Sequence, residues 1–165
     1  MLDNHARIMQ FFSMAKEVTG RKKLQKMIYI LQQCHVPFEE KYNYHFYGPY
    51  SEELTLRIEE LCNLGFLQEN KEEKSSYYQY HYQITPEGEQ FLRQFSLNMP
   101  DYSDKVEKLQ EKSSRFLELV ATLLYFDHLS RDEAFQKIQA LKPSQNYSEE
   151  EMEEAEAFIR ELKGA

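Results

Sequence analysis

The 165-residue sequence lacks any apolar run of the roughly 18–20 residues that a membrane-spanning helix needs. Its first residues, MLDNHARIMQ, are polar where a secretory signal would be apolar, so we expect neither insertion into a membrane nor export. Only two cysteines are present, Cys34 and Cys62, and both fall in predicted helices. Without an export signal they are most simply reduced, buried thiols, and the predicted location is the cytoplasm.

Motifs that would support catalysis or metal binding are also missing. The five histidines are scattered without a His-x-x-x-His pair, and neither cysteine belongs to a Cys-x-x-Cys motif. The neighbours Cys34 and His35 would point about 100° apart on a helix, which is poor geometry for a nucleophile and its base. The five glycines include no phosphate-binding loop. We therefore expect no enzymatic activity, no metal and no cofactor.

Basic charge is scarce, with 20 Lys and Arg against 28 Asp and Glu, for a net charge of −8. The first 50 residues are the exception, because they carry more basic than acidic side chains. The field of the whole molecule repels phosphate, so any nucleic-acid surface would have to be local.

The apolar spacing that is present predicts a series of short elements. Helices are expected over residues 4–18, 21–34 and 51–64, with Ser51 as the cap of the third, and a strand over residues 42–47. Strands over residues 66–69 and 77–84 would form a hairpin, and Thr85 with Pro86 would begin a fourth helix that reaches residue 95. This order is typical of a winged helix, in which strand 42–47 would close the small sheet and the third helix would enter a DNA groove.

The pattern changes near residue 99. One long helix is predicted over Val106–Leu129, and capping boxes at Ser130 and Ser148 predict two more helices. The expected fold class is therefore mainly α with a small antiparallel sheet (α+β). Residues 1–99 would form a winged helix-turn-helix domain, and residues 100–165 a helical subdomain. The long helix has a wide apolar surface, which favours a homodimer interface, with closure by the two following helices as the alternative.

Two surfaces are candidates for binding. Basic residues that could contact DNA are Arg21, Lys22, Lys23, Lys26, Arg57, Lys71 and Lys74. The third helix, however, begins with Glu52 and Glu53, which stabilise a helix N-terminus but would repel phosphate in a groove. The tyrosines of YYQYHYQIT have no interleaved basic residues, so we interpret them as facing the core rather than stacking on bases.

Short motifs connect the N-terminal half with known families. The stretches GRKKLQKMIYILQQC and YHFYGPYSEEL resemble the Lys-Leu-Gln-Lys helix and the Tyr-Gly-Pro turn of the Panacea (SocA-like antitoxin) domain. This half is also similar to the YwgA-like proteins of Firmicutes, a family without an assigned activity. The segment YYQYHYQITPEGEQFL resembles the wing and helix of PadR- and MarR-type regulators.

The Panacea resemblance implies that the chain acts by binding a protein partner. We therefore predict a non-enzymatic regulatory or adaptor protein that binds an unknown protein partner through its winged-helix domain. A winged-helix DNA-binding transcriptional regulator is the alternative that the PadR and MarR resemblance leaves open. The predicted partner-binding residues are Tyr47, Gly48, Pro49, Tyr50, Glu52 and Glu53.

Overall fold

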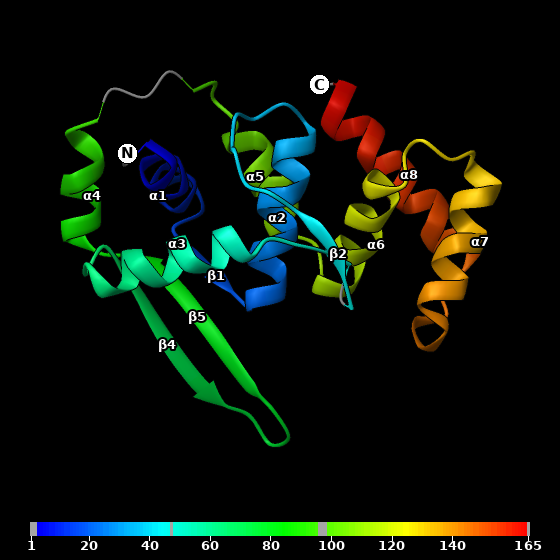
Figure 1. The fold of residues 1–165 in the computed structure, drawn as a ribbon, viewed down its shortest axis with the longest axis horizontal. Coiled ribbons are helices and arrows are strands. Elements are labelled where there is room, and N and C mark those ends of the chain that lie inside the picture. The colour runs from blue at the N-terminus through cyan, green and yellow to red at the C-terminus, as the bar shows by residue number, and fades with distance from the viewer. Residues whose placement is uncertain (1–2, 47, 96–98, 165) are drawn as a thin grey trace.

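The computed structural model describes residues 3–46, 48–95 and 99–164, and the chain is mainly helical with a small antiparallel sheet, as predicted (Figure 1). The N-terminal part forms, in order, α1 (Asp3–Ala15), β1 (Glu17–Thr19), α2 (Arg21–Gln33), β2 (Asn43–His45), β3 (Gly48–Tyr50), α3 (Glu52–Asn63), β4 (Leu67–Glu73), β5 (Tyr78–Ile84) and α4 (Pro86–Arg93). The C-terminal part forms α5 (Ser103–Gln110), α6 (Ser114–Tyr125), α7 (Arg131–Leu141), the short 3-10 helix η1 (Pro143–Gln145) and α8 (Glu149–Gly164).

The predicted hairpin is present as β4 and β5, and it projects away from the helices (Figure 1). It belongs to a three-stranded sheet of order β1-β5-β4, in which Val18 of β1 pairs with Tyr82 of β5. The prediction that strand 42–47 closes this sheet was wrong, because β2 pairs instead with β3 in a separate two-stranded hairpin. Strand β1 was missed because residues 15–18 fit the helical spacing, whereas Lys16 takes a φ of 67° that ends α1.

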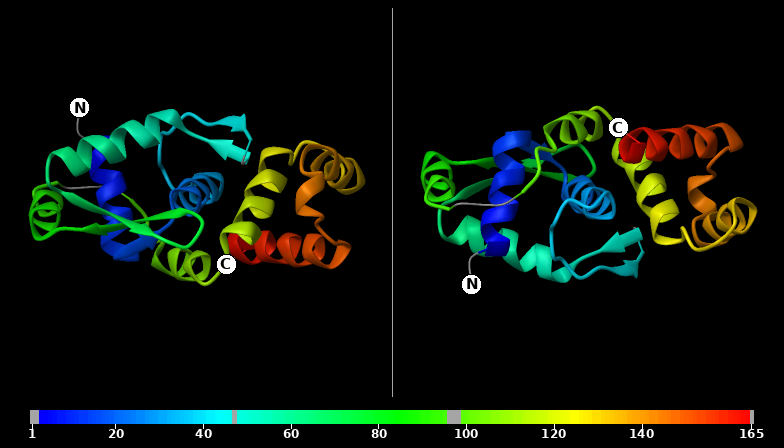
Figure 2. Two further views of the ribbon diagram at one scale, coloured as in Figure 1. Left: turned by 90° about the horizontal axis from the view of Figure 1, so that it is seen from below. Right: turned by 90° about the horizontal axis from the view of Figure 1, so that it is seen from above.

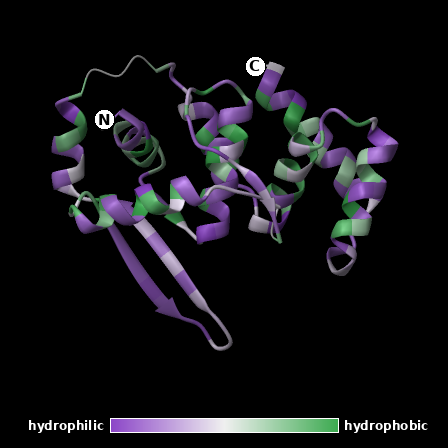
Figure 3. Cartoon of the chain, viewed as in Figure 1, coloured by the Kyte–Doolittle hydropathy of each residue, from purple (hydrophilic) through white to green (hydrophobic). Residues whose placement is uncertain are grey.

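The hairpin is more polar than its tyrosines suggested. Figure 3 shows β4 as hydrophilic along its length, and Leu67 is its one buried residue. In β5 only Tyr82 is buried, whereas Tyr78 is 55% exposed. The prediction of a core-facing tyrosine stripe therefore holds for Tyr82 and is wrong for Tyr78, because the two strands extend beyond the helices that could cover them.

Helix α2 runs through the middle of the molecule and packs against α6 (Figure 2). All eight of its residues from Leu24 to Leu31 are buried, so it contacts other elements on every side. The caps predicted at Ser51, Thr85, Ser130 and Ser148 are all formed by side-chain oxygens that accept backbone N–H groups. None of the helices within the described ranges is long and apolar enough to span a bilayer.

The single helix predicted over Val106–Leu129 is wrong, because the chain forms α5 and α6 with a break between them. Helix α5 ends at Gln110, and Ser113 caps α6 by accepting a hydrogen bond from Phe116 N at 3.1 Å. The apolar surface that suggested a homodimer is buried within the chain, where residues 117–124 are covered by α2, β3, α7 and α8. The two following helices therefore supply part of this cover, as the alternative expected, while α2 and β3 supply the rest. The dimer is left without support from this surface.

Candidate functional site

The two motifs that carry the family resemblance contact each other. The side chain of Gln25 in α2 donates through Nε2 to Ser51 O at 2.9 Å and to Thr55 Oγ1 at 3.1 Å. In return, Ser51 N donates to Gln25 Oε1 at 2.9 Å. Both Gln25 and Ser51 are buried, so these bonds satisfy backbone groups that water does not reach. The Lys-Leu-Gln-Lys motif therefore holds the start of α3 in place.

The glycine-proline turn is also buried, which corrects its assignment as a partner-binding surface. Lys26 is 1% exposed and donates to Pro49 O at 2.8 Å. Gly48 has a φ of 88°, and a Cβ at this position would lie 3.2 Å from Thr122 Oγ1. Gly48 and Pro49 are thus packed against α6, while Tyr47 lies outside the described residues. Gly-Pro turns are usually exposed, and the sequence did not reveal that α6 covers this one.

A buried ionic cluster connects this turn with the C-terminal helices. Lys142 Nζ lies 3.3 Å from Glu118 Oε2, and the two side chains are only 5% and 8% exposed. Lys142 also donates to Phe46 O at 2.9 Å, and Tyr147 OH lies 3.4 Å from Glu118 Oε2. Burial lowers the pKa of Lys26 to about 8; the charge of Glu118 opposes this shift and that of Lys142 adds to it.

Sequence reasoning missed this cluster, although one signal was present. Glu118 is the only charged residue between Phe116 and Tyr125, and charged side chains are rarely buried unless they are paired. Through this cluster Lys142, the residue after α7, is linked to Glu118 of α6 and to the Phe46 carbonyl oxygen, which directly follows β2. The cluster therefore fixes the β2–β3 hairpin relative to the C-terminal helices.

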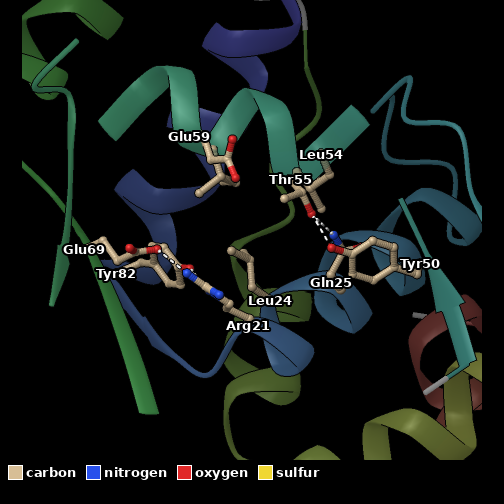
Figure 4. A pocket seen from close by; sticks show the side chains of 10 residues that line it. Arg21, Leu24, Gln25, Tyr50, Leu54, Thr55, Glu59, Glu69 and Tyr82 are labelled. Atoms are coloured by element: carbon tan, nitrogen blue, oxygen red, sulfur yellow. Dashed lines mark hydrogen bonds and ion pairs between the residues drawn. The ribbon is translucent and has the colours of Figure 1, made fainter. Parts of the chain in front are cut away.

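A pocket of about 100 Å³ lies between α2, α3 and the sheet (Figure 4). Its lining includes the apolar side chains of Leu24, Leu54 and Ile58. At one end Tyr50 OH and Thr55 Oγ1 are 2.7 Å apart and share a hydrogen bond. The pocket therefore joins apolar surface with hydroxyl groups that already have partners.

Charged side chains occupy the other end of the pocket. Arg21 Nε donates to Tyr82 OH at 3.0 Å, and Arg21 Nη2 lies 3.4 Å from Glu69 Oε2 (Figure 4). The Arg21 guanidinium also stacks 3.5 Å from the ring centroid of Tyr80. Burial raises the pKa of Tyr82, and its hydrogen bond to Glu69 adds to the shift. Glu59 of α3 also lines the pocket.

The outward face of α3 is acidic and contains one exposed leucine. Glu52, Glu53, Glu59 and Glu60 are all exposed, and Leu56 among them is 57% exposed. Two of these acids have local partners: Glu53 Oε1 accepts from Lys41 N at 2.8 Å, and Glu60 Oε2 lies 3.4 Å from His5 Nε2. The helix therefore presents an acidic surface to solvent, which we call the α3 face (Glu52, Glu53, Leu56, Glu59 and Glu60).

The seven basic residues proposed for DNA do not form one free surface. Lys26 is buried, so its prediction as a DNA contact is wrong. Arg57 is ion-paired with Glu40, whose side chain is 1% exposed. Lys23 Nζ donates to Gln110 O at 2.9 Å. These interactions hold α2 and α3 to the rest of the chain.

The other four basic residues are exposed. They are Arg21, Lys22, Lys71 and Lys74. Lys71 lies over the Tyr78 ring at 3.9 Å, and Lys74 Nζ lies 3.2 Å from Glu72 Oε2.

The two cysteine thiols lie in surroundings that disfavour the reactive thiolate. Cys34 and Cys62 are free thiols, and burial raises the pKa of each, to about 11 for Cys62. Among the residues that the structure describes, no group of three or more His, Cys, Asp or Glu side chains could hold a metal ion.

Comparison with known proteins gives one informative relationship. No family model matches the chain. A protein of Bacillus subtilis (strain 168), described as "Uncharacterized protein YwgA", is 55% identical to it over 163 residues. The match covers 99% of this chain and 98% of the relative, so it includes both the N-terminal part and the C-terminal helices.

Proposed function

The chain belongs to the YwgA family, and we propose that it is a non-enzymatic adaptor or regulatory protein that binds another protein through the α3 face. The observation that carries the proposal is an exposed leucine, Leu56, surrounded by four exposed carboxylates on one helix. This arrangement suits a partner with a small apolar pocket bordered by Lys and Arg. Of the residues predicted from sequence, Glu52 and Glu53 belong to this surface, and the half-buried Tyr50 lies beside it.

We also propose that the N-terminal part is a winged helix. The order α1-β1-α2-β2-β3-α3-β4-β5, with the β2–β3 hairpin between α2 and α3, and the sheet order β1-β5-β4 support this assignment, with the β4–β5 hairpin as the wing. In DNA-binding winged helices the helix equivalent to α3 reads the groove. Here the same helix would present carboxylates to a protein, in keeping with the resemblance to the Panacea domain. The cytoplasm is the proposed location.

DNA binding is the second candidate, supported by the exposed Arg21, Lys22, Lys71 and Lys74. Each phosphate contact would contribute about 0.9 to the slope of log affinity against log salt. The charge reversal Lys22→Glu should then weaken binding in a gel-shift assay. Gel-shift binding that survives this change would reject these basic residues as the DNA contacts, whereas the absence of any shift with the wild type would remove the DNA candidate. The acids of the α3 face already disfavour it.

A pull-down from the source cells with matched variants tests the protein-binding proposal. Leu56→Ser changes the α3 face, and Leu141→Ser is its control because Leu141 is a similarly exposed helical leucine, at 46%, on α7. We expect one partner to be retained by the wild type and by Leu141→Ser, lost by Leu56→Ser, and released at high salt. Equal recovery of every bound protein by the two variants would contradict the proposal.

A further inference from the structure

We propose that the pocket between α2, α3 and the sheet receives a cationic side chain, arginine or lysine, from the protein partner. This inference rests on the proposed function, because Glu59 belongs both to the α3 face and to the lining of the pocket (Figure 4). A partner that covers the α3 face would therefore lie next to the pocket opening.

The pocket has the shape and surface for one long side chain. Its volume of about 100 Å³ is well below the roughly 300 Å³ at which pockets for drug-sized ligands begin. Leu24, Leu54 and Ile58 supply apolar contacts for the methylene groups of an arginine or lysine stem. Such a side chain can bury its stem in this pocket while its charged end stays near the polar rim.

The charges at the pocket select a cation. Arg21 is already paired with Glu69, hydrogen-bonded to Tyr82 and stacked on Tyr80, so its charge is balanced within the chain. Glu59 is different, because no residue in the described ranges forms a hydrogen bond or an ion pair with it. One uncompensated carboxylate therefore remains at the pocket. An anionic ligand would be repelled by Glu59, whereas a guanidinium or ammonium group would pair with it.

A titration of the full ¹⁵N-labelled chain followed by NMR tests this inference. The probe is the tripeptide acetyl-Gly-Arg-Gly-amide, and its neutral match replaces arginine with citrulline, which has almost the same shape. We expect the arginine peptide to shift the backbone amides of Gln25, Thr55 and Tyr82, with a clearly weaker effect of the citrulline peptide. Equal binding of the two peptides, or arginine-induced shifts confined to other parts of the chain, would overturn the proposal.

Two variants locate the charge that matters. Glu59→Gln removes the carboxylate at the pocket, and Glu161→Gln removes an exposed carboxylate on α8 that lies outside both the α3 face and the pocket lining. Glu59→Gln should weaken the arginine peptide about two- to fivefold, as expected for a partly exposed charge pair, while Glu161→Gln leaves the affinity unchanged. An equal effect of the two variants would refute the role of Glu59.

The pull-down and the titration fail independently. If Leu56→Ser loses the partner but the arginine peptide does not bind the pocket, the proposed function stands and the pocket assignment falls. If the peptide binds in the pocket but no partner depends on Leu56, the proposed function falls.

Discussion

Removing the charge of Glu118 should destabilise the fold far more than removing a comparable charge at the surface. Glu118 is the only carboxylate in the buried cluster, where it faces Lys142 at 3.3 Å and contributes to keeping Lys26 protonated. The change Glu118→Gln keeps nearly the same shape and an oxygen that can still accept from Tyr147. The substitution leaves the buried Lys26 and Lys142 without a carboxylate in the cluster to balance their charges.

The expected loss follows from the geometry. Two unit charges 3.3 Å apart attract each other by about 5 kcal/mol at an effective dielectric constant of about 20. Part of this lost attraction is offset, because burying a neutral glutamine side chain costs less free energy than burying a carboxylate. Removing one partner of a buried ion pair typically costs about 3–5 kcal/mol, and we expect a value near the lower end of that range.

Urea unfolding followed by circular dichroism at pH 7 measures this loss, and Glu161→Gln is the matched control. Glu161 lies 3.4 Å from Lys108, almost the same distance, but the two side chains are 56% and 35% exposed. Its loss should cost less than about 1 kcal/mol. If Glu118→Gln costs no more than Glu161→Gln, the reasoning that burial makes the cluster important is wrong.

Two further predictions concern the same region. Because the pKa of Lys26 is lowered to about 8 in the folded state from 10.5, the unfolded chain binds more protons between these values, so the free energy of unfolding should rise with pH. Between about pH 7 and pH 9, the free energy of unfolding of the wild type should rise by about 1 kcal/mol more than that of Lys26→Met, as measured by urea titration. The same dependence on pH in both proteins would contradict this. Gly48→Ala should lower the free energy of unfolding by about 1–3 kcal/mol, because Gly48 has a positive φ and lies close to Thr122. Gly65→Ala is the control and should cost less, because Gly65 has a φ of 81° but a Cβ there would have no neighbour within 4 Å. Equal melting temperatures of the two alanine variants would show that the contact with α6 adds nothing.

Much of the N-terminal part could be predicted because its signals are local. Helices α2 and α3 follow from apolar spacing and the Ser51 cap, and the β4–β5 hairpin follows from its polar tip. Strand β1 could not be found this way, because three residues become a strand only by pairing with β5, more than 60 residues away. The break before α6 was readable in principle, since Ser113 is a good helix cap.

The candidate site was less predictable than the fold. The acids of α3 were identified as unfavourable for DNA, and the structure places them on an exposed face. The Gly48–Pro49 turn and Lys26 were expected at the surface, but their burial depends on α6, which begins more than 60 residues further along the chain. The pocket combines side chains from α2, β3, α3, β4 and β5, so no single stretch of sequence indicates it.

The buried cluster also limits how this chain can be recombined. A crossover near Met99–Pro100 would take Lys26 and the Phe46 and Pro49 carbonyl oxygens from one parent, and Glu118 and Lys142 from the other. A chimaera of two divergent relatives would keep a balanced cluster only where both parents carry the same charges at these positions. Libraries of shuffled relatives should therefore yield folded proteins mainly from breakpoints that keep all the residues of the buried cluster from one parent.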